Sequence, residues 1–302
     1  MPDFLRIDAH IQSWNPKKAG YEWLASLPEK LNTERNLTEV EPQLEDNQIN
    51  FGLLIQAAND PDENDVLLEA CETSLWLQGV VGWIPLLDPV RTEEFLLTKP
   101  PLLKGLRHMI HHEANPEWLI QPPVIQSFSL LERNQMPFDV SANLPEHLDC
   151  ILRLSEKYPD QKWCLNHLGT PPVKSRERWG KWGDQMKALS TNPNVFIKIA
   201  GLGLLTRDLS DWLPDEIQPY IEQSLEWFGT DRAMVGSAWP FVELCGGYTR
   251  NWQTTETILQ KVLPSSELES ILGRNALRFY GLHLPEYEQL NVQTVSILHD
   301  SI

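Results

Sequence analysis

The sequence predicts an α/β protein built as a closed (β/α)8 barrel of the TIM type. Short apolar runs rich in β-branched residues and bounded by turn residues occur eight times along the chain, and helix-like stretches lie between most of them. A repeated strand–helix order implies right-handed crossovers and a parallel sheet. Eight such units within 302 residues, with no linker-like break, favour one closed barrel over an open sheet.

The eight predicted strands have the same build, a mostly apolar run that stops at polar, glycine or proline residues. In chain order they are Leu5–Ala9, Phe51–Gln56, Val80–Pro85, Leu103–Leu106, Phe138–Ser141, Lys162–Asn166, Val195–Ile199 and Ala233–Gly236. Their spacing leaves room for a helix after most strands, as the barrel requires.

Three intervening stretches repeat apolar residues at intervals of three and four, which is typical of amphipathic helices. They are Leu37–Asn47 behind the potential cap Asn36, Asn64–Leu77, and Leu148–Tyr158, which ends at Pro159. We therefore expect these stretches to be crossover helices on the outside of the barrel.

Residues 1–282 are predicted to form one domain, and 283–302 a polar tail that packs on the barrel or on a partner chain. Long segments follow the first strand (Asn15–Asn36) and the sixth (Thr170–Asn194). Loops at the carboxyl ends of strands would wall a pocket.

The composition argues against nucleic acids and membranes as binding partners. A formal net charge of −17 argues against a nucleic-acid groove, which needs clustered Lys and Arg. No apolar run approaches the roughly 20 residues that span a bilayer, and Met1–Phe4 lacks the basic start of a signal peptide. We expect a cytoplasmic protein that acts on a small molecule, with homo-oligomerisation possible and four unpaired cysteines buried.

Candidate catalytic residues follow three of the predicted strands. His10 and Gln12 are two residues apart after the first strand, so their side chains leave the same face. His167 follows the sixth strand and Ala238 the eighth. Because barrel enzymes keep their active sites at the carboxyl ends of strands, these positions are expected to converge, although the methyl group of Ala238 can do no chemistry.

Other polar residues at strand ends have two interpretations each. Arg107, followed by His108, ends the fourth strand, and its guanidinium would either bind a carboxylate through two hydrogen bonds or make structural contacts. Lys198, near the end of the seventh strand, would either pair with an acid or bind a substrate oxygen. Further along the loop, His111 and His112 are expected to face solvent.

Asn166 and His167 are the strongest local indication of a functional site, since they follow an apolar strand and precede a glycine and prolines that would end it. A neutral imidazole at this position can accept a proton from water, polarise a carbonyl or bind a metal.

At these residues the chain resembles the amidohydrolase-related family of the metal-dependent hydrolase superfamily, which includes sugar-acid lactonases and 2-pyrone-4,6-dicarboxylate lactonase. The similarity runs over nearly the whole chain. It rests on Ile7–His10 with Trp14, Tyr21–Leu24, Lys104–His108, Asn166–Gly169, Lys198 with Gly201–Leu202, Gly236–Pro240, and Gly273–Ala276 with Phe279–Tyr280. The resemblance implies a TIM-type barrel that opens lactone rings with water as the nucleophile.

The resemblance also implies roles for individual residues. Arg107 and Lys198 would bind substrate oxygens, Tyr21 and Trp239 would form the pocket wall, and His108 and Asn166 are further candidates for contact with the substrate. His10 and Gln12 would orient the carbonyl that His167 polarises, and an aspartate at position 238 would activate water.

The chain departs from the family at two positions, because the family usually has a second histidine in place of Gln12 and an aspartate in place of Ala238. His10 and His167 supply two imidazoles, whereas catalytic zinc normally has three protein ligands and a water. We expect no cofactor and no tightly held metal, with a divalent ion such as zinc as the alternative.

The missing aspartate should weaken catalysis, because a general base contributes about 10²–10⁴-fold. Only weak lactone hydrolysis is expected unless His167 or His108 replaces it. Ala238 is either an introduced Asp→Ala change or the natural residue of a divergent member. The alternatives to a lactonase are a decarboxylase, dehydratase or isomerase of a small cyclic acid, and a ligand-binding protein without turnover.

Overall fold

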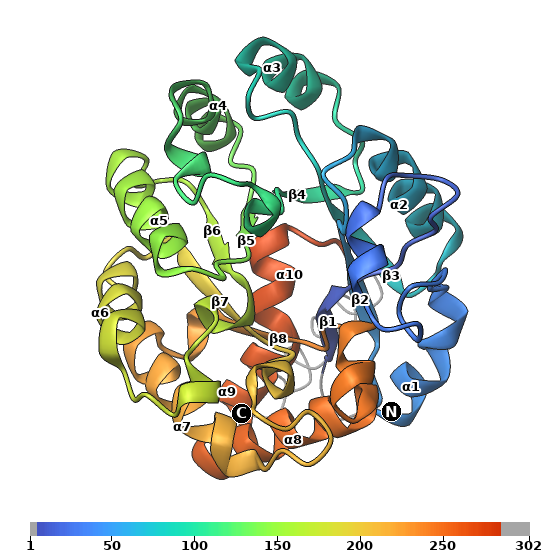
Figure 1. Ribbon diagram of the computed structural model, residues 1–302, viewed down its shortest axis with the longest axis vertical. Helices are drawn as coiled ribbons and strands as arrows, with labels where there is room; N and C mark the ends of the chain where they lie inside the picture. The colour runs from blue at the N-terminus through green and yellow to red at the C-terminus, as the bar shows by residue number, and fades with distance from the viewer. Residues whose placement is uncertain (1–4, 285–302) are drawn as a thin grey trace, which may run out of the picture.

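The computed structural model describes residues 5–284, and they form eight parallel strands inside a ring of helices (Figure 1). Each strand pairs with the next one in sequence, from β1 to β8. The strands are β1 (Ile7–Ile11), β2 (Phe51–Ile55), β3 (Leu77–Gly82), β4 (Leu103–Arg107), β5 (Phe138–Val140), β6 (Trp163–Leu165), β7 (Val195–Ala200) and β8 (Ala233–Gly236). The predicted (β/α)8 barrel is confirmed.

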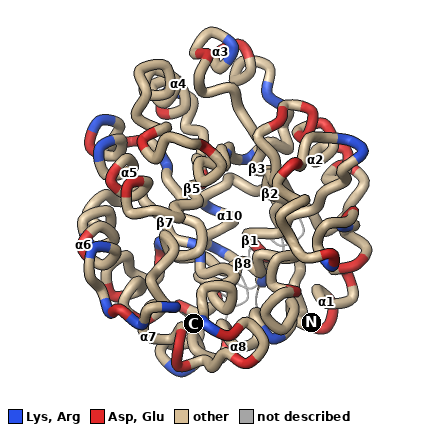
Figure 2. The backbone as a smooth tube through the Cα atoms, in the orientation of Figure 1, with Lys and Arg blue, Asp and Glu red and all other residues tan. Residues whose placement is uncertain are grey.

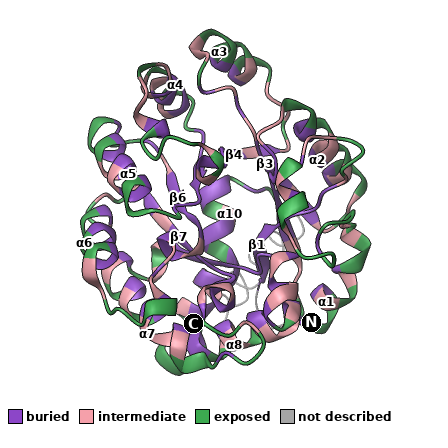
Figure 3. Cartoon of the chain, viewed as in Figure 1, coloured by how far each residue is buried: buried purple, intermediate pink, exposed green. Residues whose placement is uncertain are grey.

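The helices surround the strands and present their apolar faces to them (Figure 3). They are α1 (Glu41–Asp46), α2 (Pro61–Thr73), α3 (Pro89–Thr98), α4 (Pro122–Arg133), α5 (Pro145–Lys157), α6 (Gly180–Leu189), α7 (Pro214–Phe228), α8 (Gly247–Val262), α9 (Ser265–Glu269) and α10 (Asn275–Tyr280). Several of them begin at a proline, whose fixed φ suits the first helical position and whose missing N–H is not needed there.

The three predicted helices exist with shifted ends. α2 begins at Pro61, three residues before the predicted start, because the carboxylate of Asp60 caps it by accepting a hydrogen bond from the amide of Asp62. Asn36 is a cap as predicted, but the turn that it caps is a short one that precedes α1. The segment Thr170–Asn194, which we expected to be a long loop, contains α6.

The amino-terminal end of the barrel is covered by α10. Phe279 and Tyr280 pack in one cluster with the inward-facing residues of β1, β2, β6 and β8, including Ile7, Leu53 and Met234. A larger core lies between the strands and the outer helices. With this end filled, access to the barrel interior lies at the carboxyl ends of the strands.

The barrel closes at the seam between β8 and β1, and the closure holds site residues together. The amide of Ala238 donates to the carbonyl of His10 at 2.9 Å, and the amide of Gln12 donates to the carbonyl of Trp239 at 2.9 Å. The buried carboxylate of Asp8 accepts hydrogen bonds from the amides of His10 and Ser237. The same bonds that close the sheet therefore fix the main chain around position 238.

Charged residues of both signs are distributed over the outer helices and loops (Figure 2). The four cysteines are unpaired and buried, as predicted. Within residues 5–284, no helix combines the length and apolarity needed to span a membrane. Most of the predicted tail lies outside the described residues, so its packing on the barrel or a partner stays a prediction.

Candidate active site

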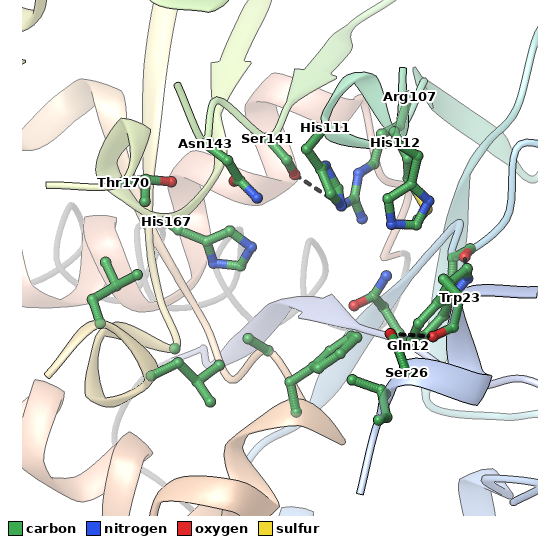
Figure 4. A pocket seen from close by; sticks show the side chains of 18 residues that line it. Gln12, Trp23, Ser26, Arg107, His111, His112, Ser141, Asn143, His167 and Thr170 are labelled. Atoms are coloured by element: carbon green, nitrogen blue, oxygen red, sulfur yellow. Dashed lines mark hydrogen bonds between the residues drawn. The ribbon is translucent and has the colours of Figure 1, made fainter. Parts of the chain in front are cut away.

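A cavity of about 420 Å³ opens at the carboxyl ends of the strands (Figure 4), within the usual size range of small-molecule pockets. One side is polar and the other is apolar. The polar side chains come from the end of β4 and from the loops after β1, β4, β5 and β6, and they are Gln12, Ser26, Arg107, His111, His112, Ser141, Asn143, His167 and Thr170. No Asp or Glu is among the lining residues.

His167 projects into this cavity from a strained turn directly after β6 (Figure 4). Its φ is +56°, and Leu168 and Thr170 also have positive φ. Left-handed backbone costs about 1–2 kcal/mol per L-residue, and such strain is concentrated at functional sites. The turn therefore holds the imidazole in a position that an unstrained strand end would not provide.

The hydrogen bonding of His167 determines its tautomer. Its Nδ1 lies 2.9 Å from the main-chain oxygen of Ala200. A carbonyl can only accept, so Nδ1 carries the proton and Nε2 keeps a lone pair. Burial, together with the positive charges of Arg107 and Lys198, lowers the pKa of His167 to about 4. The ring is thus neutral at pH 7 and able to accept a proton.

His10 lies against His167, with 4.8 Å between the ring centroids, but it does not line the cavity. The side chain is fully buried, and neither ring nitrogen has a hydrogen-bond partner among the described residues. Burial and the neighbouring His167 lower the pKa of His10 well below its usual value. The structure therefore pairs the two predicted imidazoles, with only His167 exposed to the cavity.

Gln12 and Arg107 reach the cavity with their orientation fixed by one main-chain oxygen. Gln12 Nε2 and Arg107 Nη1 each donate to the carbonyl of Gln56 at 3.0 Å. Because that oxygen only accepts, the amide nitrogen of Gln12 must face it, which leaves Gln12 Oε1 as an acceptor for a hydroxyl group or water.

Arg107 brings a buried positive charge into the site. The side chain is buried, its Nη2 donates to Ser141 Oγ at 2.8 Å, and it forms no ion pair within residues 5–284. Burial lowers the pKa of Arg107 to about 10, so it stays protonated at pH 7. A buried charge without a direct ion pair is costly, and an anionic group in the cavity would reduce that cost.

Ala238 also lines the cavity, and its backbone is left-handed, with φ +61°. Alanine adopts this conformation at a cost, whereas Asp, Asn and Gly are enriched in it. The main chain at this position therefore suits an aspartate, although the side chain present is a methyl group.

The sequence model of the amidohydrolase family matches residues 7–282. The chain belongs to the amidohydrolase family. It is 25% identical to an L-fucono-1,5-lactonase of Burkholderia ambifaria over 288 residues, which cover 94% of this chain and 98% of that protein. It is also 25% identical to an L-fucono-1,5-lactonase of Burkholderia multivorans, over 93% and 97% of the two chains.

Solved structures of amidohydrolases share the fold. An amidohydrolase from Burkholderia multivorans with bound zinc superposes with a TM-score of 0.85 at 23% identity, over 92% of this chain and all of that one. A probable 2-pyrone-4,6-dicarboxylic acid hydrolase from Acinetobacter baumannii, with citric acid bound, gives 0.73 at 16% identity over 92% and 99%. Family and relatives together support hydrolase activity on a small molecule.

The donors in this amidohydrolase do not fit a catalytic zinc ion. Two imidazoles, His10 and His167, lie together, while Gln12 and Ala238 provide neither an imidazole nor a carboxylate. Across residues 5–284, no group of three His, Cys, Asp or Glu side chains is placed to hold a metal. Zinc in catalytic sites prefers three such ligands and a water.

Lys198 does not reach the cavity. Its side chain is fully buried, and its Nζ lies 2.5 Å from Asp139 Oδ2. Tyr280 donates to the other oxygen of Asp139 at 2.6 Å. Of the two interpretations of Lys198, the structure shows the acid pair, and its contact with a substrate oxygen stays a prediction.

His108 is also turned away from the cavity. Its Nε2 lies 2.7 Å from Glu113 Oε1, and its ring stacks on Trp118 with centroids 3.9 Å apart. Burial lowers its pKa. These contacts hold the loop after β4 and place His108 outside the cavity lining, so its contact with substrate stays a prediction.

Tyr21, Asn166 and Trp239 are likewise buried outside the cavity lining. Tyr21 packs against the loops after β1 and β2, and burial and the nearby carboxyl of Glu63 raise its pKa. Trp239 is enclosed behind the seam. The predicted wall of Tyr21 and Trp239 is thus replaced by other aromatic residues.

Trp23 and Phe241 form the apolar wall. They come from the loops after β1 and β8, and their rings stack with centroids 5.6 Å apart and planes at 25°. The indole nitrogen of Trp23 donates to the carbonyl of Ala57 at 2.8 Å, which fixes the ring. The long segment after β1 therefore walls the pocket as predicted, through Trp23 rather than Tyr21.

Several polar residues that line the cavity were not expected from the sequence. His111 and His112 border the cavity instead of facing only solvent, and burial lowers the pKa of His111 to about 2. Ser141, Asn143 and Thr170 follow β5 and β6. Their position just after a strand is the signal that could have identified them, since it is the signal that identified Arg107 and His167.

Proposed function

We propose that this protein opens the lactone ring of a small sugar acid by adding water. The observation that carries the proposal is a neutral imidazole, His167, whose Nε2 lone pair shares a cavity with the unpaired guanidinium of Arg107. The proposal is supported by the likeness to two L-fucono-1,5-lactonases over nearly their whole lengths.

The reaction needs one proton acceptor that later becomes a donor. The oxygen of water bonds to the lactone carbonyl carbon while His167 Nε2 accepts a proton from that water. When the bond between this carbon and the ring oxygen breaks, the imidazolium returns the proton to the ring oxygen. The products are a carboxylic acid and a hydroxyl group on one open chain, so atoms and charge balance.

Arg107 stabilises the negative charge that develops on the carbonyl oxygen. A guanidinium has five N–H groups, and two of them donate to Gln56 O and Ser141 Oγ. The others are free for an oxyanion, which fixed donors stabilise strongly in a dry site. The same charge then holds the carboxylate of the product.

The remaining lining residues position the sugar. Trp23 and Phe241 offer an apolar face to the carbon side of the ring, and Gln12 Oε1 accepts from a hydroxyl group. His10 packs on His167 outside the cavity, so we assign it to positioning. Without a carboxylate at position 238, a base with a pKa of about 4 gives slow turnover, since bases act best near the working pH.

The test is hydrolysis of a panel of sugar-acid lactones, including L-fucono-1,5-lactone, followed by acid release and product mass. Addition of one water supports a lactonase, whereas loss of carbon dioxide indicates a decarboxylase. The Ala238→Asp variant is assayed beside the chain as it stands. If neither protein accelerates the opening of any lactone, the proposed function is wrong.

A second candidate, ligand binding without turnover, is favoured by the methyl group of Ala238 and by the absence of acids from the lining residues. Calorimetry with the open acids would detect it. Tight binding by a protein that stays inert, even with Asp at position 238, would select this candidate.

A further inference from the structure

A second cavity of about 240 Å³ adjoins the first, between the loops after β5 and β6. Asn143 and Thr170 border both cavities, and Figure 4 shows them at the same edge of the first one, beyond His167. The second cavity is smaller than a pocket that holds a complete drug-sized ligand. Its size and position suit an extension of whatever occupies the first.

Gln185 of α6 points to a ligand with a hydrogen-bond donor. The side chain is 5% exposed and lines the second cavity. Its amide nitrogen donates to Pro145 O at 2.7 Å and to Asp149 Oδ1 at 2.5 Å. Both oxygens only accept, so the amide cannot be flipped, and its Oε1 is left buried with no partner within residues 5–284.

That orphaned acceptor has an energetic consequence, because a buried polar atom without a partner costs about 1–3 kcal/mol. A ligand hydroxyl group that reaches this oxygen from the second cavity would satisfy it. Gln161, beside the opposite end of β6, also has an unpaired Oε1 but does not line this cavity. The inference therefore rests on the acceptor and the cavity together.

The rest of the second cavity favours a neutral ring. Leu148 and Trp182 supply apolar surface, while Glu177 and Lys181 contribute one charge of each sign. Lys181 Nζ is already paired with Asp149 Oδ2 at 2.9 Å. A charged ligand would face a like charge or compete with this pair, whereas a sugar ring offers hydroxyl donors and a carbon face.

We propose that the second cavity is a subsite for a sugar residue attached to the sugar acid, so that the substrate class is a glycosylated aldonolactone. This proposal rests on the proposed function, because it assumes that the first cavity holds the lactone unit. The glycosidic link would pass between Asn143 and Thr170.

The experiment compares the binding affinities of open-chain sugar acids, so that the result does not depend on turnover. Calorimetry with gluconate, lactobionate and melibionate measures the effect of a second sugar on one common acid. We expect at least one disaccharide acid to bind tenfold or more tightly than gluconate. Leu144→Trp, which fills the edge of the second cavity from an exposed position, should remove that gain and leave gluconate binding unchanged.

Leu213→Trp is the matched control. Leu144 and Leu213 are both exposed and each directly precedes a helix that begins with proline, but Leu213 does not line the second cavity. Equal or undetectable binding of the acids, or a gain that survives Leu144→Trp, would overturn the subsite. Failure of the proposed function shows separately, as absence of lactone hydrolysis, whatever the binding result.

Discussion

His167 Nδ1 donates a hydrogen bond of 2.9 Å to the main-chain oxygen of Ala200, so the end of β7 sets the tautomer of a side chain carried by the turn after β6. The proton lies on the side of the backbone, and the lone pair of Nε2 remains for the cavity. A barrel brings neighbouring strand ends together. Because the end of β7 lies beside the turn after β6, His167 is held in the tautomer that can act as a base before any ligand binds.

Replacing His167 should strongly reduce hydrolysis with little change in fold. His167→Asn is the suitable variant, because Asn tolerates the positive φ at this position. We expect kcat for the lactone to fall by about 10²-fold or more and KM to change little, since the imidazole acts on the proton of water. Steady-state kinetics, with circular dichroism as the folding control, check this. A variant that retains full kcat would remove His167 from the mechanism.

The value of kcat/KM should decrease at low pH. Only neutral His167 accepts a proton, so kcat/KM should rise as the pH increases through about 4 and then level off. The lowered pKa also means that below about 6.5 the unfolded chain binds more protons than the folded one, so stability decreases as the pH falls from there towards 4. Circular dichroism at each pH separates the two effects. If kcat/KM of the folded protein decreased already near pH 6.5, the assignment of the base to His167 with a lowered pKa would be contradicted.

Position 238 can be tested with a matched pair of variants. Ala238→Asp supplies a carboxylate on a backbone that suits it, and we expect kcat/KM to rise by about 10²–10⁴-fold. Ala238→Asn relieves the same left-handed strain without a base, so it should raise the melting temperature and leave the rate unchanged. A similar rate increase in both variants would mean that the backbone, and not a base, limits activity.

Most of the strands and the residues at their ends could be predicted from the sequence, whereas the partners of buried side chains could not; β3 ends at Gly82, three residues before the predicted Pro85. His167 and Arg107 were found because each directly follows or ends an apolar run, and barrel geometry brings such ends together. Lys198 also lies near a strand end, but its side chain is held by Asp139, a residue 59 positions away.

The direction in which a loop side chain points could also not be predicted from the sequence. Tyr21 and Trp23 are two residues apart, yet Trp23 forms the pocket wall and Tyr21 packs behind it near Glu63. No periodicity governs an irregular segment, so its sequence alone does not show which aromatic ring faces inward. For this reason the segment that walls the pocket could be predicted, but not that Trp23 rather than Tyr21 lines the cavity.

Metal content provides a fourth test, because the donor set does not suit zinc. The purified protein should hold far less than one zinc per chain by elemental analysis, and a chelator should leave its hydrolysis rate unchanged. The double variant Gln12→His with Ala238→Asp adds an imidazole and a carboxylate beside His10 and His167, and it should bind zinc. Stoichiometric zinc in the protein as it stands would show that other donors complete a site.

The buried pair of Lys198 and Asp139 should contribute strongly to the stability of the fold. Lys198→Met leaves the Asp139 carboxylate buried without its cation, so the free energy of unfolding should fall by about 3–5 kcal/mol. Lys18→Met is the control, because Lys18 and Glu69 form an exposed pair that contributes about 0–1 kcal/mol. Urea unfolding measures both, and lactone kinetics on the folded variants add a second readout. A Lys198→Met protein as stable as Lys18→Met, but with a strongly raised KM, would return Lys198 to the substrate-binding residues.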